Sequence, residues 1–243
     1  MLALYKREIT NFIGSLIGQI VIIIFLIING LFLWVFPIES NILENGYANI
    51  DGLFSIAPFV FLFLIPAITM RSFAEERRSG TIEMLLTKPI TDLQIILAKY
   101  FAGLSLVILS LLPTLIYGFT VYQFGFPKGN IDLGGMWGSY IGLVFLAAGF
   151  LSIGIFSSSL TDNQIISFIL SLFLCGFIYL GFEFIYSLDL FGKIDLFIYS
   201  LGINAHYASL SRGVIDTRDV IYFISLISLF IILTKISLES RKW

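Results

Sequence analysis

Hydrophobic residues along the chain gather into six long runs that short polar stretches separate. The runs cover about residues 15–36, 53–70, 92–124, 136–156, 164–186 and 220–238. A helix needs about 20 apolar residues to cross a bilayer, so each run is long enough to span a membrane once. The pattern predicts an all-α polytopic membrane protein, with six transmembrane helices in a single domain over residues 1–243.

A shorter amphipathic pattern over residues 1–13 precedes the first run. Its apolar residues recur at three- and four-residue steps, with polar residues on the other side: Leu2, Tyr5, Ile9, Phe12 and Ile13 against Lys6, Arg7, Thr10 and Asn11. This spacing is typical of a helix that lies in the membrane interface, here an elbow before the first span. The same residues also fit a simple basic flank of that span, and both interpretations stay open.

The most polar stretch, about residues 73–87, lies between the second and third runs. Ser72 and Glu75 have the spacing of a capping box, which predicts a helix start. Gly80 interrupts this helix. Thr81 can cap a second short helix, and Glu83 falls in its first turn, where the helix dipole favours an anion. We therefore expect two short helices on the surface of the membrane.

The apolar face of the second short helix has no bilayer-length run to cover it. We interpret the stretch as a coupling helix that docks a soluble partner, although a solvated charged loop is the alternative. Apolar anchors at the centre and charges at the rim are the usual arrangement of such an interface. The expected anchors are Ile82, Leu85 and Leu86, and the expected rim is Glu75, Glu76, Arg77 and Arg78.

Small residues mark the fourth and fifth runs. Gly134, Gly138 and Gly142 are spaced by four and lie on one helix ridge, which predicts close packing against another helix. In the fifth run, Ser167 and Ser171 begin a four-residue stripe that continues through Cys175 and Tyr179 to Glu183. We expect the two serines to pack against a neighbouring helix.

Glu183 is the one acidic residue deep in an apolar run, and a charge stranded in lipid costs roughly 2.5 to 3.5 kcal/mol. It is therefore a candidate for translocation, or else it reaches the outer interface or an outer arginine. The half-apolar stretch that follows, 187–217, predicts interfacial or re-entrant helices. His206 lies there without metal-ligand neighbours, so we expect an interfacial polar residue.

Composition narrows the class of protein. Hydrophobic residues make up 58% of the chain and charged residues 12%, against roughly a quarter in soluble domains. The net charge of −2 argues against a nucleic-acid partner, which requires a basic surface. The single cysteine, Cys175, excludes a disulfide framework within the chain and a multi-cysteine metal site.

The distribution of basic residues predicts the orientation in the membrane. Lysine and arginine gather in the N-terminal segment, in the stretch between the second and third runs and at the C-terminus, whereas the opposite loops hold few of them. Because cytoplasmic segments carry the excess of basic residues, we expect both termini and the coupling helix in the cytoplasm.

Catalytic motifs are missing from the sequence. It contains no phosphate-binding G-x-x-x-x-G-K-[ST], no H-E-x-x-H and no G-x-S-x-G. We therefore expect that the chain is not an enzyme by itself, binds no cofactor or metal, and depends on a separate ATPase for energy.

Two motifs carry a resemblance to a known family. The run EERRSGTIEMLLTKPI after the second span and SRGVIDTRDVIYF before the sixth, together with the elbow and six spans, resemble the ABC-2 type transporter permeases over essentially the whole chain. The first motif reads E-x-x-x-G-T-x-E-x-L-L, with Glu76, Gly80, Thr81, Glu83, Leu85 and Leu86 at its fixed positions. Within the family the chain most resembles the gliding motility-associated permeases of Bacteroidota.

The resemblance implies a permease subunit of the bacterial inner membrane. Its partners would be two copies of a nucleotide-binding subunit, which hold ATP and Mg, and a second membrane subunit or a second copy of the chain. Spans two and five would face that membrane partner. ATP-driven closure would be transmitted through residues 75–86 to drive export or mechanical work. A membrane anchor that transmits force without a substrate remains open, as does a proton-coupled carrier that depends on Glu183.

Overall fold

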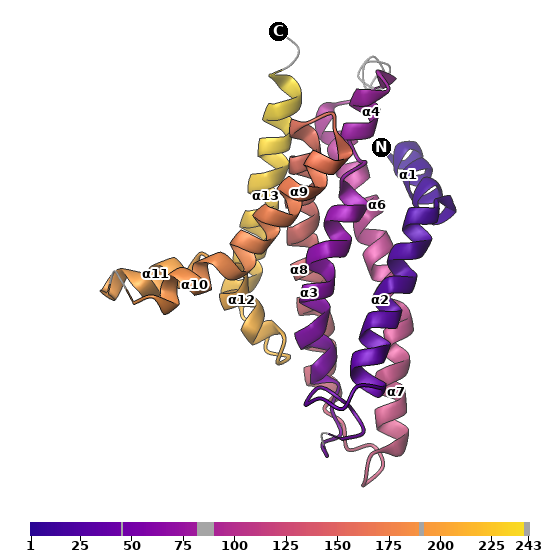
Figure 1. The fold of residues 1–243 in the computed structure, drawn as a ribbon, viewed down its shortest axis with the longest axis vertical. Helices are drawn as coiled ribbons and strands as arrows, with labels where there is room; N and C mark the ends of the chain where they lie inside the picture. Colours follow the sequence, from indigo (N-terminus) through magenta and orange to yellow (C-terminus); the bar gives the residue numbers. More distant parts are fainter. Residues whose placement is uncertain (45, 82–89, 190–191, 241–243) are drawn as a thin grey trace.

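The chain folds into a bundle of long helices (Figure 1). The computed structural model describes residues 1–44, 46–81, 90–189 and 192–240, and no strand occurs among them. Six helical segments in this part are long and apolar enough to cross a membrane: Leu16–Trp34, Asp51–Arg78, Asp92–Phe124, Leu133–Leu160, Gln164–Ser187 and Thr217–Glu239. The prediction of an all-α polytopic membrane protein is confirmed.

Helices α1 (Leu2–Gly14) and α2 (Leu16–Trp34) are separated at Ser15, whose extended backbone changes the direction of the chain. The Ser15 hydroxyl accepts a hydrogen bond from the Gly18 N–H at 3.1 Å and so caps α2. Helix α1 packs against α6 and buries Leu4 and Glu8, while Leu2 is exposed. The N-terminal segment is therefore a separate helix on the side of the bundle, and one of its buried residues is charged.

The second and third spans differ in how they accommodate proline. Helix α3 (Asp51–Thr69) contains Pro58 and Pro66 without interruption, and the short helix α4 (Ala74–Arg78) follows after a turn. The third span is divided into α6 (Asp92–Leu111), a 3-10 turn η1 (Leu112–Thr114) that contains Pro113, and α7 (Leu115–Phe124). Thr91 and Gln94 have the spacing of a capping box in the sequence, and they form one at the start of α6.

Helix α8 (Leu133–Leu160) is the centre of the bundle. It is 28 residues long, extends beyond the predicted run at both ends, and contacts α3, α6, α9, α12 and α13. Small residues allow these close approaches: a Cβ atom added to Gly154 would lie 2.2 Å from Thr69 Oγ1 of α3. In a lipid environment, where burial of apolar surface drives little association, such packing holds helices together.

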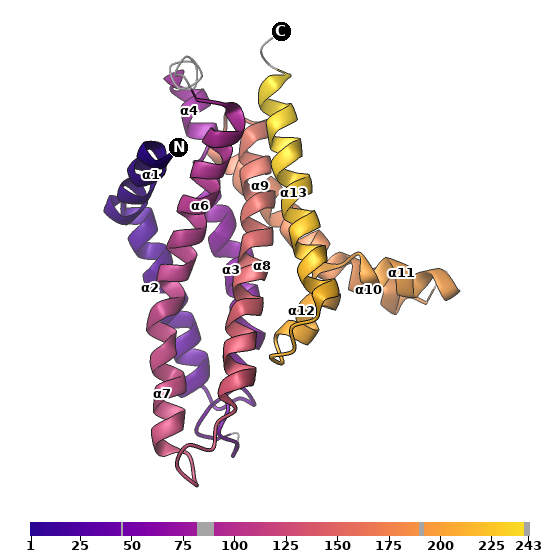
Figure 2. The ribbon, with the colours of Figure 1, turned by 180° about the vertical axis from the view of Figure 1, so that it is seen from behind.

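The fifth span is irregular. It comprises α9 (Gln164–Gly176), a π-helical turn η2 (Phe177–Gly181) and α10 (Phe182–Ser187). After η3 (Gly192–Ile194), the short helices α11 (Asp195–Ser200) and α12 (Ile203–Leu210) lead to α13 (Thr217–Glu239). Both views show α10 and α11 projecting sideways from the bundle, with α12 beside the start of α13 (Figures 1 and 2).

The N-terminus, α4 and the end of α13 lie at the same end of the bundle (Figure 1). We call this end the termini end. The loops after α2 and α7 lie at the opposite end.

Candidate functional site

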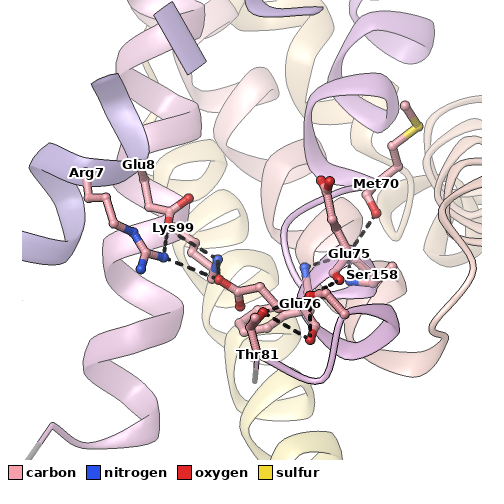
Figure 3. Close-up of polar contacts among 11 residues, drawn as sticks. Arg7, Glu8, Met70, Glu75, Glu76, Thr81, Lys99 and Ser158 are labelled. Carbon is pink, nitrogen blue, oxygen red and sulfur yellow. Dashed lines mark hydrogen bonds and ion pairs between the residues drawn. The ribbon is translucent and has the colours of Figure 1, made fainter. Parts of the chain in front are cut away.

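Four charged side chains meet at the termini end, where α1, α4 and the beginning of α6 come together. We call Arg7, Glu8, Glu76 and Lys99 the charged cluster (Figure 3). Arg7 and Glu8 come from α1, Glu76 from α4, and Lys99 from the second turn of α6. Three segments that are distant in sequence are thus connected by charge.

Lys99 is the buried centre of this cluster. Its Nζ lies 2.9 Å from Glu76 Oε1 and 3.5 Å from Glu8 Oε1, and its side chain is 3% exposed. The ammonium group also lies 5.3 Å from the centre of the Phe73 ring, within cation–π range. Lys99 is buried because α1 packs along α6 and Glu76 of α4 reaches its ammonium group.

Arg7 completes the cluster from the exposed side. Its Nη2 donates to Glu8 Oε1 at 2.7 Å and lies 3.4 Å from Glu76 Oε1. Two cations and two carboxylates therefore balance, so the cluster has no net charge. Removal of one partner from a buried ion pair leaves the other uncompensated, which is the costly event at such sites.

A second polar contact fixes the start of α4. The Ser158 hydroxyl, near the end of α8, accepts hydrogen bonds from the Phe73 and Ala74 N–H groups at 3.0 and 3.1 Å and donates to the Met70 carbonyl (Figure 3). The predicted capping box of Ser72 and Glu75 is wrong, since α4 begins without a side-chain cap of its own. Ser158 of the central helix accepts hydrogen bonds from the first N–H groups of α4 instead.

The residues predicted to form the charged rim separate into two groups. Glu75 and Arg78 are exposed, whereas Glu76 and Arg77 are half-buried. Gly80 has a φ of +69°, a left-handed conformation that explains why a glycine ends α4. The hydroxyls of Ser79 and Thr81 lie 2.8 Å apart beyond it. Ile82, Glu83, Leu85 and Leu86 lie outside the described residues.

A cavity of about 300 Å³ adjoins the charged cluster between α1 and the turn from α3 to α4. Its lining is mostly polar or charged and includes Asn11, Ser15, Arg71 and Ser72 along with the cluster itself. Helices α1 and α4 therefore contact each other through the side chains that surround this cavity, and their backbones are not closely packed.

The glycines of the predicted packing ridge differ in what they contact. A Cβ atom at Gly142 would lie 2.5 Å from Leu210 Cβ of α12, and one at Gly138 would lie 2.3 Å from the Gly213 carbonyl oxygen. At Gly134 the nearest atom would be Asp132 Oδ1 of the same turn, at 3.4 Å. Ser167 and Ser171 are fully buried on α9, which packs against α8 and α3.

Glu183 is separated from this serine stripe by the π-helical turn. A π turn inserts residues into the helical repeat, so the residues after it no longer continue the face of those before it. Cys175 and Tyr179 are buried together with the serines, but Glu183 is exposed. Its Oε2 accepts a hydrogen bond from Asn204 Nδ2 of α12 at 2.6 Å.

Sequence reasoning missed Glu8, Lys99 and Ser158 as members of the site. Glu8 falls four residues after buried Leu4, on the side of α1 away from the predicted apolar stripe. Lys99 is a lone cation among the buried residues of α6. Such an isolated charge in an apolar stretch is a signal for a buried partner. Ser158 offered no comparable signal among its serine neighbours.

Among the described residues, no three His, Cys, Asp or Glu side chains lie close enough together to hold a metal ion. The exposed charges of the site can bind and orient a protein surface.

Comparison with models of known protein families identifies the family of the chain. The family model described as "ABC-2 family transporter protein" matches residues 2–238, nearly the whole sequence. No curated protein matches the chain.

Proposed function

The chain belongs to the ABC-2 family of transporter proteins and is a membrane subunit of an ABC transporter, and we propose that it couples ATP hydrolysis by a separate nucleotide-binding subunit to export or mechanical work. The ATP and Mg are bound by that subunit. Residues 73–87 form the docking segment, with Ile82, Leu85 and Leu86 as anchors and a charged rim around them. The chain has six spans in the inner membrane and both termini in the cytoplasm.

The charged cluster is the observation that supports this function best. A segment that receives a push from a partner must be attached firmly to the membrane helices, or the push moves only the segment. Glu76 is held by Lys99 of α6 and approached by Arg7 of α1, and the start of α4 is held by Ser158 of α8. A displacement of α4 is therefore passed to two spans and the elbow at once.

The assembly that we propose contains two copies of the ATPase and a second membrane subunit, either a GldG-like protein or a second copy of this chain. Helix α9 has an exposed apolar face that includes Ile165, Ile169 and Phe173, which is available to such a partner or to lipid. We further propose a role in gliding motility, for which the only support is the resemblance of the sequence to the gliding motility-associated permeases.

Two other functions are distinguished by separate measurements. A membrane anchor that transmits force without a substrate would form a complex with no continuous cavity between its subunits, which imaging with and without nucleotide would reveal. A proton-coupled carrier would require Glu183 to lie on the pathway. The hydrogen bond from Asn204 and the exposed position of Glu183 at the side of the bundle give that carrier little support.

The docking function is tested by Leu85→Asp. We expect this variant to lose co-purification with the ATPase subunit while its spans remain folded, because a charge replaces an apolar anchor. Leu43→Asp is the matched control, since it makes the same change at an exposed leucine at the opposite end. Undiminished ATPase binding by Leu85→Asp, or equal loss in both variants, would count against the proposal.

The orientation is tested by cysteine labelling. Cys175 is buried and free, so Cys175→Ser gives a background without reactive thiols. In this background we expect Ser79→Cys to react with an impermeant maleimide only from the cytoplasmic side. Asn130→Cys, at the opposite end, should react only from the outside. The reverse pattern would overturn the proposed topology.

A further inference from the structure

A second polar cluster joins the ends of three helices away from the coupling segment. His206 and Ser209 of α12, Asp219 in the first turn of α13 and Tyr222 one turn later form what we call the histidine cluster. The carbonyls of Ser200 and Leu201, at the end of α11, complete it. These contacts connect the side-projecting helices to the last span.

Both nitrogens of the His206 ring face hydrogen-bond acceptors. Nδ1 lies 2.7 Å from Asp219 Oδ1, and Nε2 lies 2.9 Å from the Ser200 carbonyl oxygen. A neutral imidazole carries one N–H and can donate to one of the two, whereas the imidazolium ion donates to both. The geometry therefore fits the protonated ring, with the Asp219 carboxylate as its counter-charge.

The neighbouring contacts fix the ring in this place. Its plane stacks on Tyr222, with ring centres 3.9 Å apart, and the Tyr222 hydroxyl donates to the Leu201 carbonyl at 2.7 Å. The Ser209 hydroxyl donates to the second carboxylate oxygen of Asp219. Helices α12 and α13 are therefore joined by several contacts. The hydrogen bond from His206 to the Ser200 carbonyl of α11, by contrast, exists only while Nε2 carries a proton.

We propose that His206 is a proton-dependent latch that holds α11 against α12 and α13. When the imidazolium loses its proton, the remaining N–H stays on Nδ1 with the carboxylate, because a bond to a charged acceptor is the stronger one. Nε2 then presents a lone pair to the Ser200 carbonyl, and the two atoms repel. The end of α11 then keeps only its bond from Tyr222, so its contact with α12 and α13 is weakened and α11 moves away from the bundle more often.

The direction of the effect follows from the groups that face the ring. From α13 these are the Asp219 carboxylate and the Tyr222 ring, and from α11 they are the carbonyls of Ser200 and Leu201. Glu183 of α10 accepts a hydrogen bond from Asn204, and the Arg212 guanidinium donates to the Ala208 carbonyl. Neither side chain is therefore a second charged partner of the His206 ring. The latch is closed at acidic pH and opens as the pH rises.

The position of the His206 side chain gives it access to protons from the solvent. The side chain of His206 is 19% exposed, and α12 lies at the side of the bundle away from α4. In the topology that we propose, the ring senses the pH on the outer side of the membrane. The latch does not require the docking of an ATPase, and either one can be absent without the other.

The test measures the distance between α11 and α13 in the complete transporter in lipid nanodiscs. Spin labels at Leu196→Cys and Ile224→Cys, two exposed positions, are introduced in the Cys175→Ser background. We expect one short, narrow distance distribution at pH 5.5. At pH 8.5 we expect at least a threefold loss of that population in favour of longer distances.

Two variants separate the latch from general loosening of the structure. His206→Gln, which carries no titratable proton, should give the same distribution at both pH values. Tyr222→Phe removes one bond to α11 but keeps the imidazole, so it should retain the pH dependence. A distribution in the unmodified chain that does not change with pH would overturn the proposal, as would a pH dependence that persists in His206→Gln. If His206→Gln does not fold, Asp219→Asn serves instead, and its short-distance population at pH 5.5 should fall.

Discussion

Lys99 and Glu76 lie on opposite sides of residues 82–89 in the sequence, yet the ammonium nitrogen of Lys99 is 2.9 Å from Glu76 Oε1. This ion pair closes a loop of the chain at its base. Two residues that flank the core of the predicted docking segment in the sequence are therefore joined by a buried contact. Glu8 joins the same ammonium group from the elbow helix at 3.5 Å.

The first prediction concerns Lys99→Met. The methionine fills a similar volume, but Glu76 and Glu8 then share only Arg7, which lies at the exposed side. Loss of one partner of a buried ion pair costs about 3 to 5 kcal/mol. We expect amide hydrogen exchange in α1 and α4 to rise steeply and ATP-driven activity of the assembled transporter to fall.

Lys6→Met is the control for this change, since Lys6 is exposed on α1 and has no ion-pair partner among the described residues. Its exchange pattern should match that of the unmodified chain. Unchanged protection of α1 and α4 in Lys99→Met would show that the charged cluster does not connect these helices.

The second prediction concerns Ser158→Ala. Loss of the hydroxyl leaves the Phe73 and Ala74 N–H groups buried without acceptors, and each unsatisfied group costs about 1 to 3 kcal/mol. We expect a lower thermal unfolding temperature and faster exchange at the start of α4.

Ser159→Ala is a closely matched control. Ser159 is the next residue and equally buried, and within the described part of the chain its hydroxyl bonds only to the Phe156 carbonyl of its own helix. It should lose far less stability than Ser158→Ala. Equal effects of the two substitutions would mean that the serine does not cap α4.

Local patterns in the sequence were sufficient for the spans and for the capping box at Thr91. The elbow helix and the glycine that ends α4 were predicted in the same way, because each depends on residues within a few positions of one another. The contacts that define the site are of another kind. Lys99 and Ser158 act across 23 and 85 residues of chain, respectively, so neither partner appears in the local pattern.

The fifth span shows a second limit on what the sequence pattern can predict. The four-residue stripe from Ser167 to Glu183 assumes one uninterrupted helix, and it holds for the buried residues up to Tyr179. The π-helical turn at Phe177–Gly181 changes the phase of the helix, and nothing in the hydrophobic pattern marks its position. Glu183 lies beyond this turn, where it is exposed and accepts a hydrogen bond from Asn204, whereas the stripe residues before it are buried.

The third prediction concerns the glycine ridge of α8. Gly142→Ala places a methyl group 2.5 Å from Leu210 Cβ, an atom close to the backbone that cannot move aside without moving α12. Overpacking of this kind costs about 1 to 3 kcal/mol. We expect a clear drop in thermal unfolding temperature.

Gly134→Ala gives the contrast on the same ridge. The position is exposed and makes no contact with another helix, so the helix preference of alanine over glycine should leave stability equal or raise it by up to about 1 kcal/mol. If Gly142→Ala were as stable as Gly134→Ala, the close approach of α8 and α12 would be refuted.

The fourth prediction concerns Glu183→Gln. The glutamine carbonyl can still accept the hydrogen bond from Asn204, so the loss is that of exchanging a charged for a neutral acceptor, about 1 kcal/mol. ATP-driven activity should stay close to that of the unmodified chain, because the side chain lies beyond the π turn at the side of the bundle. Glu183→Leu removes the acceptor altogether and should loosen the contact between α10 and α12. Abolished transport in Glu183→Gln, with an intact fold, would instead favour the proton-coupled carrier, since the amide differs from the acid chiefly in its inability to carry the proton.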